Sequence, residues 1–239
     1  MSARNVAIFG WILAAALSVA VILLTRQLDR RLATEAGIRA NPAGLDTHRD
    51  IEVPTTRWLM VLGDSRAAGL GGADLPGWEI LNLGIPGQTS AEILARAGRE
   101  LVLLDPDALV LIGGINDLKT GEAEDAIARA TRNLVDVARV AERLDIPILI
   151  VDAWPNAELG ARSLLLPADL QDRCNRLAVA LRRSLDGSAV QFVDIPLLGE
   201  DGHVRSDLAR DALHLNDAGN RILSDTIEFH LGEIVRDDS

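Results

Sequence analysis

From residue 58 onward, short apolar runs alternate with longer amphipathic segments. Apolar runs of strand length lie at residues 58–62, 79–83, 108–112, 146–151 and 190–193. Apolar residues recur at helical spacing over residues 90–104, 123–143, 168–185 and 217–235. Continuous apolar strands are typical of strands buried on both faces, and their alternation with helices favours a parallel sheet covered on both sides. The pattern therefore predicts an α/β domain.

This architecture indicates where a functional site should lie. In open α/β sheets, ligands bind outside the carboxyl ends of the strands. The residues that directly follow each predicted strand are therefore the first candidates for chemistry.

Composition narrows the possible partners. The formal net charge is −11, which argues against binding to the phosphate backbone of a nucleic acid. Aromatic residues make up 3% of the chain and tyrosine is absent, so a stacking platform for single-stranded nucleic acid is not expected. Cys174 is the only cysteine, so no disulfide can form within the chain.

Residues 6–24 form an apolar run without a charged side chain. As a helix this run would span roughly 28 Å, close to the thickness of the hydrocarbon core of a bilayer. A cleaved signal peptide is the main alternative, but its apolar region is usually only about 7–15 residues long. We therefore expect a transmembrane signal anchor over residues 1–24, a polar stalk over residues 25–57 and a catalytic domain over residues 58–239.

The orientation of such an anchor is poorly determined by its flanking charges. Arg4 precedes the apolar run, whereas Arg26, Arg30 and Arg31 follow it and are partly offset by Asp29. The positive-inside rule thus leans toward a cytoplasmic domain by a margin of about one charge. We expect a single-pass membrane protein with an extracytoplasmic catalytic domain, but both topologies stay open.

Four segments carry residues suited to acyl transfer. The first predicted strand ends in Gly63-Asp64-Ser65, where a serine on a strand-to-helix turn can present its hydroxyl at the sheet edge. Gly84 follows the second strand, and its small size lets backbone approach a ligand closely. Asn116 follows the third strand and can direct a side-chain N–H at a developing oxyanion. Each segment alone is equally well explained as an ordinary turn or helix cap.

The fourth segment lies near the C-terminus, where Asp211 precedes His214 by three residues. A carboxylate at this spacing can bind one ring nitrogen of the histidine and leave the other nitrogen facing a nucleophile. Either residue alone is more often a solvated loop residue.

Together the four segments resemble the SGNH hydrolase superfamily of GDSL-like serine esterases and lipases. The family's serine, glycine and asparagine correspond to Ser65 in GDS, Gly84 in NLG and Asn116 in GIND. Its aspartate and histidine correspond to Asp211 and His214 in DALH. The resemblance implies a Ser65-His214-Asp211 triad, with an oxyanion hole formed by Ser65, Gly84 and Asn116, and it implies no cofactor and no metal.

The resemblance covers roughly residues 58–235 and implies a three-layer, flavodoxin-like domain with a five-stranded parallel sheet. Two residues depart from the common pattern. Arg66 stands where many members have an apolar residue, and Leu215 stands where proline is frequent. Arg66 is expected to alter the charge of the substrate pocket, and Trp154, which follows the fourth strand, is expected to line it.

The most direct functional hypothesis is hydrolysis of small acyl esters, such as acetyl groups on carbohydrate. A thioesterase or lysophospholipase is an alternative because a membrane anchor would hold the site near lipid. An acyltransferase is a second alternative, in which a sugar hydroxyl replaces water. The non-enzyme alternative is a membrane-tethered binding or assembly protein. The sequence does not determine the oligomeric state.

Overall fold

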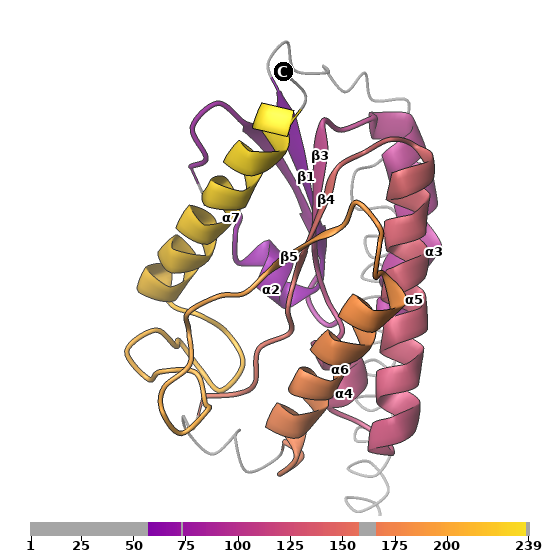
Figure 1. Cartoon of the computed structure of the whole chain (residues 1–239). Helices are drawn as coiled ribbons and strands as arrows, with labels where there is room; N and C mark the ends of the chain where they lie inside the picture. The colour runs from indigo at the N-terminus through magenta and orange to yellow at the C-terminus, as the bar shows by residue number, and fades with distance from the viewer. Residues whose placement is uncertain (1–56, 73, 158–165, 238–239) are drawn as a thin grey trace, which may run out of the picture.

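The computed structural model describes residues 57–72, 74–157 and 166–237 (Figure 1). The expected anchor, residues 1–24, and the expected stalk, residues 25–57 except for the last, lie outside the described residues. In the described part of the chain, no helix combines the length and apolarity needed to cross a membrane.

Five parallel strands form the centre of the domain. They are β1 (Trp58–Gly63), β2 (Glu79–Gly84), β3 (Ala108–Ile112), β4 (Ile148–Val151) and β5 (Gln191–Val193). Their order in the sheet is β2-β1-β3-β4-β5, with every neighbouring pair parallel. This is the flavodoxin-like order, in which the chain reverses direction across the sheet between β1 and β3.

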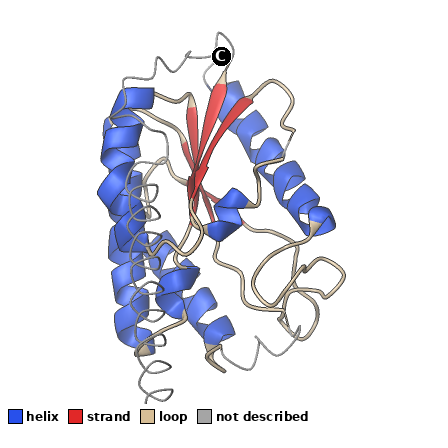
Figure 2. Cartoon of the chain, turned by 180° about the vertical axis from the view of Figure 1, so that it is seen from behind, coloured by secondary structure: helices blue, strands red, loops and turns tan. Residues whose placement is uncertain are grey.

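Helices cover both faces of the sheet (Figures 1 and 2). The helices are α2 (Ser65–Ala68), α3 (Ser90–Leu104), α4 (Ile115–Leu118), α5 (Ala123–Arg143), α6 (Leu170–Ser184) and α7 (Asp217–Asp237). One hydrophobic core joins the sheet to α3, α5 and α6, and the second joins its opposite face to α2 and α7. The domain therefore has three layers.

The strand sequences explain this arrangement. Along β1, Met60 and Leu62 belong to one core, whereas Leu59 and Val61 belong to the other. All four side chains are buried, because successive residues of a strand point to opposite faces of the sheet. Burial of a large aliphatic side chain stabilises a fold by about 1.5–3 kcal/mol, so a strand that is apolar at every position favours a central place in the sheet.

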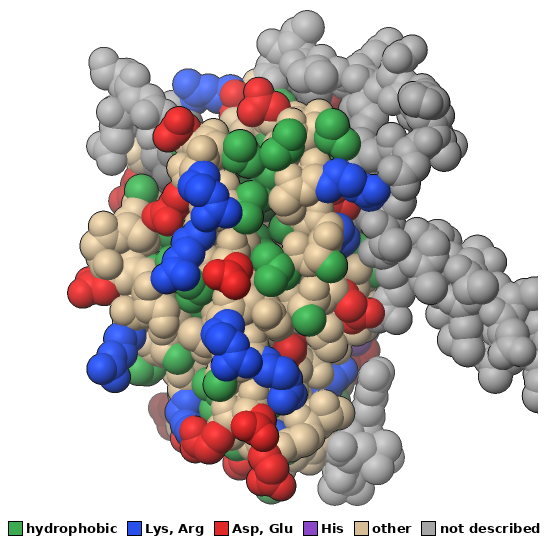
Figure 3. Space-filling model, turned by 90° about the vertical axis from the view of Figure 1, so that its right-hand side faces the viewer, with side chains coloured by type: hydrophobic (Ala, Val, Ile, Leu, Met, Phe, Trp, Pro, Cys, Tyr) green, Lys and Arg blue, Asp and Glu red, His purple; other side chains and the backbone are tan. Residues whose placement is uncertain are grey.

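The outer surface beside α3 and α5 has a different character. Figure 3 shows acidic and basic side chains interspersed on this face, with scattered apolar side chains between them. The charges of the two signs are mixed, which is typical of a solvated surface.

The predicted elements differ from the observed ones mainly at their ends. β4 begins at Ile148, two residues later than expected, because the N–H of Ile146 still bonds the carbonyl of Ala141 at the end of α5. The short helices α2 and α4 were not predicted, since four residues are too few to show a helical hydrophobic period.

Candidate active site

The candidate nucleophile lies where β1 passes into α2. Asp64 caps this short helix by accepting a hydrogen bond from the N–H of Arg66, 2.9 Å away. The N–H of Asp64 bonds the carbonyl of Ile112 at the end of β3, 3.1 Å away. Ser65, the first residue of α2, is thereby held at the carboxyl ends of β1 and β3, where the direction of the chain across the sheet reverses.

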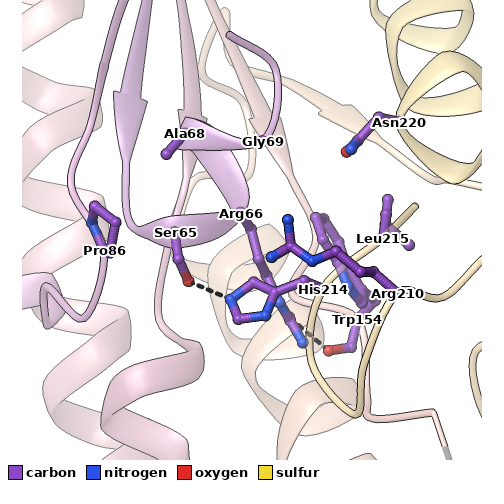
Figure 4. A pocket seen from close by; sticks show the side chains of 10 residues that line it. All are labelled: Ser65, Arg66, Ala68, Gly69, Pro86, Trp154, Arg210, His214, Leu215 and Asn220. Carbon is purple, nitrogen blue, oxygen red and sulfur yellow. Dashed lines mark hydrogen bonds between the residues drawn. The ribbon is translucent and has the colours of Figure 1, made fainter. Parts of the chain in front are cut away.

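Ser65, His214 and Asp211 form a continuous hydrogen-bonded chain. The Nε2 atom of His214 lies 2.9 Å from Oγ of Ser65 (Figure 4), and its Nδ1 atom lies 2.9 Å from each carboxylate oxygen of Asp211. Such an arrangement lets the imidazole remove a proton from the serine while the carboxylate fixes the ring. The structure therefore brings together three residues that lie up to 149 positions apart in the sequence.

The loop between β5 and α7 keeps Asp211, the acidic residue of the triad, ionised. Burial alone would raise the pKa of Asp211, but the N–H groups of Leu213 and His214 and the ring of His214 outweigh this effect and hold the pKa at about 2. The N–H of Arg210 also bonds the carbonyl of His214, 2.8 Å away, which closes the loop on itself. The carboxylate is thus fixed in the position that orients the imidazole.

Asn116 lies at the start of α4, next to the loop that follows β2. Its side chain is buried and donates one N–H to the carbonyl of Gln88, 2.8 Å away. An amide nitrogen carries two hydrogens, so one remains for an oxyanion. The N–H of Ser65 donates to no acceptor among the hydrogen bonds of the described residues, so it is a second candidate donor.

Gly84 does not have the role expected from the sequence. Its N–H donates to Oδ1 of Asn82, 2.9 Å away, and is therefore not available to an oxyanion. A Cβ at this position would lie 2.2 Å from the backbone nitrogen of Ala68. Gly84 is required because β2 passes very close to α2, not because of its N–H.

Gly87 is a candidate donor that sequence reasoning missed. It lies between Pro86, which lines the cavity beside Ser65, and Gln88, whose carbonyl contacts Asn116. Its φ of 80° is in the left-handed region that favours glycine, and within the described residues its N–H has no hydrogen-bond acceptor. The Pro-Gly pair before the cap of α3 was the available signal, since it predicts a tight turn at a strand end.

A buried arginine on α3 fixes these loops. The Nη2 atom of Arg96 donates to the carbonyls of Gly63 and Leu83, 3.2 and 2.8 Å away, at the ends of β1 and β2. The same guanidinium bonds Oε1 of Gln88 and Oε2 of Glu100. Two of the three segments that carry candidate oxyanion donors, those after β1 and β2, are thus attached to one side chain.

A cavity of about 340 Å³ opens at the Ser65–His214 pair (Figure 4). Arg66 and Trp154, the two residues expected to line a substrate pocket, both contribute to its wall. They are only 4% and 6% exposed, however, and Nε and Nη1 of Arg66 bond backbone carbonyls. Arg66 therefore supports the wall of the cavity and contributes little to the charge of the cavity surface.

A second cavity, of about 460 Å³, shares Gly69 and Asn220 with the first. Its wall carries charged side chains with the acidic ones in excess: Asp74, Asp217, Asp225 and Arg221. The two hollows therefore adjoin at the start of α7. Over the described part of the chain, no three His, Cys, Asp or Glu side chains gather closely enough to hold a metal ion.

A known protein family matches most of the chain. Residues 54–222 match the model of the GDSL-like lipase/acylhydrolase family. No curated protein matches the chain.

Solved structures show the same fold. A GDSL-like lipase from Bacteroides thetaiotaomicron has 19% sequence identity and a TM-score of 0.63, covering 82% of this chain and 98% of its own. A lipase/acylhydrolase from Enterococcus faecalis has 20% identity and a TM-score of 0.55, covering 73% and 95%. A catalytic mutant of an acetylxylan esterase from Geobacillus stearothermophilus has 18% identity and a TM-score of 0.55, covering 72% and 92%. At these identities the likeness concerns the fold.

Proposed function

The chain belongs to the GDSL-like lipase/acylhydrolase family and is an ester hydrolase, and on this premise we propose that it cleaves small acyl esters through Ser65, His214 and Asp211. The observation that carries the proposal is the unbroken hydrogen-bonded chain from Oγ of Ser65 through both ring nitrogens of His214 to Asp211. This geometry provides a nucleophile, a base and a group that orients the base.

In the proposed reaction, Oγ of Ser65 attacks the carbonyl carbon of the ester while Nε2 of His214 takes the hydroxyl proton. Asp211 stabilises the imidazolium that forms. His214 then gives its proton to the departing alcohol, which leaves an acyl group on Ser65. A water molecule, deprotonated by His214, attacks this acyl-enzyme and releases the carboxylic acid and the free serine.

The negative charge on the carbonyl oxygen needs donors that are in place before the reaction. We assign this role to the N–H of Ser65, the second amide hydrogen of Asn116 and the N–H of Gly87. Gly87 replaces Gly84 in this set because the N–H of Gly84 is already bonded to Asn82.

The excess of acidic side chains on the wall of the second cavity favours an uncharged, hydroxyl-rich alcohol part. The carboxylates of Asp74, Asp217 and Asp225 can accept hydrogen bonds from hydroxyl groups and would repel the phosphate of a phospholipid. The first cavity, about 340 Å³, suits an acyl group of modest size. Acetyl esters of carbohydrate fit both features, and one protein of similar fold is an acetylxylan esterase.

A thioesterase or lysophospholipase would use the same three residues on a different acyl group. An acyltransferase would pass the acyl group from Ser65 to a sugar hydroxyl instead of water. These are the alternatives that a substrate panel must separate.

The test combines a substrate panel with substitution of the nucleophile. Hydrolysis of acetyl, butyryl and long-chain p-nitrophenyl esters and of acetylated xylo-oligosaccharides is measured with the purified chain and with Ser65→Ala. We expect the highest kcat/KM on acetyl esters and activity near background for Ser65→Ala. Ser206→Ala, an exposed serine in the β5–α7 connection, is the matched control and should keep full activity. Full activity of Ser65→Ala would exclude Ser65 as the nucleophile.

We also propose that residues 1–24 tether the domain to a membrane. The proposal rests on the uncharged run over residues 6–24.

A further inference from the structure

Arg66 follows Ser65 directly, and its side chain reaches two other segments of the chain. Nε donates to the carbonyl of Leu213, 3.2 Å away, and Nη1 donates to the carbonyl of Trp154, 2.6 Å away (Figure 4). The guanidinium carbon also lies 4.3 Å from the centre of the Trp154 ring, within the range of a cation–π contact. One side chain thus joins α2, the loop after β4 and the loop that carries His214.

The contact with Leu213 matters because Leu213 is the residue before His214. Other hydrogen bonds also shape this loop. Within it, Asp211 accepts from the N–H groups of Leu213 and His214. From the segment after β4, the N–H of Ala157 donates to the carbonyl of Ala212. Among the hydrogen bonds of the described residues, only the one from Nε of Arg66 ties the backbone of this triad loop to the segment that carries Ser65.

Burial makes this contact rigid and unsuited to direct substrate binding. Arg66 is 4% exposed, and its remaining nitrogen, Nη2, is buried without a partner among the described residues. Burial lowers the pKa of Arg66 to about 10, while the carboxylates of Asp64 and Asp211 act in the opposite direction, so the group stays charged near neutral pH. A planar guanidinium can hold two carbonyls at fixed positions, which a flexible ammonium does less well.

We propose that Arg66 is a positioning residue, which holds the backbone of the His214 loop at the distance from α2 that keeps His214 Nε2 in contact with Ser65 Oγ. The inference rests on the proposed function of Ser65 and His214. It assigns the arginine that departs from the family pattern to alignment of the base, not to recognition of substrate.

Alignment and substrate binding predict different kinetics. A displacement of about 1 Å in a catalytic group can cost roughly 10²-fold in rate. Arg66→Met keeps the length of the side chain but leaves the carbonyls of Leu213 and Trp154 without a donor. We expect kcat for p-nitrophenyl acetate to fall by about 10²-fold with little change in KM.

The reactivity of Ser65 itself gives a second readout. A fluorophosphonate inactivates a serine only when a base activates it, so its rate of reaction reports the Ser65–His214 pair without a bound ester. The experiment uses the full-length chain purified in detergent, and the inactivation rate of Arg66→Met should fall in parallel with kcat. Arg66→Lys should recover part of both losses, because an ammonium can reach one of the two carbonyls.

Arg173→Met is the matched control. Arg173 is also buried and its Nη1 donates to two backbone carbonyls, those of Leu118 and Gly121, but it does not contact the triad loop. Circular dichroism and thermal unfolding compare the stability of the variants. If Arg173→Met loses about as much stability as Arg66→Met, it should still keep the kcat and the inactivation rate of the wild-type protein.

Several outcomes would overturn the inference. An unchanged kcat in Arg66→Met would show that the contact is dispensable, a rise in KM alone would make Arg66 a substrate contact, and an equal kcat loss in Arg173→Met would indicate a general effect of packing. If Arg66→Met does not fold, Arg66→Lys decides: a lower kcat at constant KM supports the inference and an unchanged kcat overturns it. Failure of the unchanged protein to react at Ser65 would overturn the proposed function, whereas equal reaction of the unchanged protein and Arg66→Met would overturn only the role of Arg66.

Discussion

Asp64 and Asp211 both belong to the candidate site, yet their surroundings move their pKa values in opposite directions. Asp64 is fully buried, and burial raises its pKa to about 6 despite the nearby charge of Arg66 and the hydrogen bond from the Arg66 N–H. Asp211 accepts backbone and ring hydrogen bonds that outweigh its burial and hold its pKa at about 2. Asp64 is more deeply buried than Asp211 and accepts fewer hydrogen bonds, which explains the difference.

Asp64 should make the stability of the domain depend on pH. Its pKa is higher in the folded state than the ordinary value of 3.8, so between pH 4 and 6 the folded state binds more protons than the unfolded state. The contribution of Asp64 to stability therefore falls as pH rises through this window. Asp64→Asn keeps an acceptor for the Arg66 N–H but cannot ionise. Urea unfolding at pH 4, 5, 6 and 7 should show the unchanged protein losing stability relative to Asp64→Asn as pH rises, and a constant difference would contradict the assignment.

Asn116 should contribute to catalysis more than to folding. Asn116→Ala removes one proposed oxyanion donor, and loss of such a donor costs roughly 10²–10³-fold in kcat. Steady-state hydrolysis of p-nitrophenyl acetate measures the loss. Asn133→Ala is the control, because Asn133 donates its side-chain N–H to Ser90 Oγ and is not one of the proposed oxyanion donors. Equal kcat values for the two variants would remove Asn116 from the oxyanion hole.

At the scale of elements, sequence patterns predicted the long helices best. The expected helix over residues 90–104 matches α3, because the capping box of Thr89 and Glu92 marks its start and left-handed Asp105 ends it. α5 also matches its expected bounds, since 21 residues provide many repeats of the helical period. Short elements such as α2 depend on contacts with distant strand ends, which periodicity cannot report.

A buried ion pair on α3 should matter more for stability than an exposed pair on α5. The side chains of Arg96 and Glu100 are 2% and 0% exposed, and burial raises the pKa of Glu100 while lowering that of Arg96. Glu100→Ala leaves the guanidinium that holds the loops after β1 and β2 without its counter-charge. We expect a loss of about 3–5 kcal/mol in the free energy of unfolding.

The exposed pair Arg139–Asp136 provides the comparison, with side chains 55% and 54% exposed. Asp136→Ala should cost less than about 1 kcal/mol, because water screens exposed pairs. Chemical denaturation of both variants measures the two losses. Losses of similar size would indicate that Arg96 finds other partners when Glu100 is removed.

At the scale of the whole molecule, the sequence predicted that residues from distant segments would gather at one sheet edge. It did not predict which backbone N–H groups there would lack a hydrogen-bond acceptor. Ser65, Asn116 and His214 were expected at one sheet edge because each follows a strand or precedes the last helix. In the structure His214 contacts Ser65, and the amide of Asn116 bonds the carbonyl of Gln88 in the loop after β2. The role of Gly84 was wrong, since the acceptor of its N–H depends on how β2 packs against α2. The order of the strands came from the family resemblance, because pairing between distant strands leaves no local pattern.

The whole-chain prediction concerns the proposed membrane tether. Both hydrophobic cores and all the proposed catalytic residues lie within residues 58–233, so removal of residues 1–24 deletes none of these residues. The shortened chain should therefore fold and keep its kcat/KM on p-nitrophenyl acetate. The full chain should sediment with membranes and require detergent for release, since an uncharged run of this length partitions into the bilayer. Arg139→Glu and Arg183→Glu change the charge of exposed positions outside residues 1–24 in the full chain. These control variants test whether surface charge alone causes sedimentation. Recovery of the full chain in the soluble fraction would exclude the tether, and misfolding of the shortened chain would show that residues 1–24 pack into the domain.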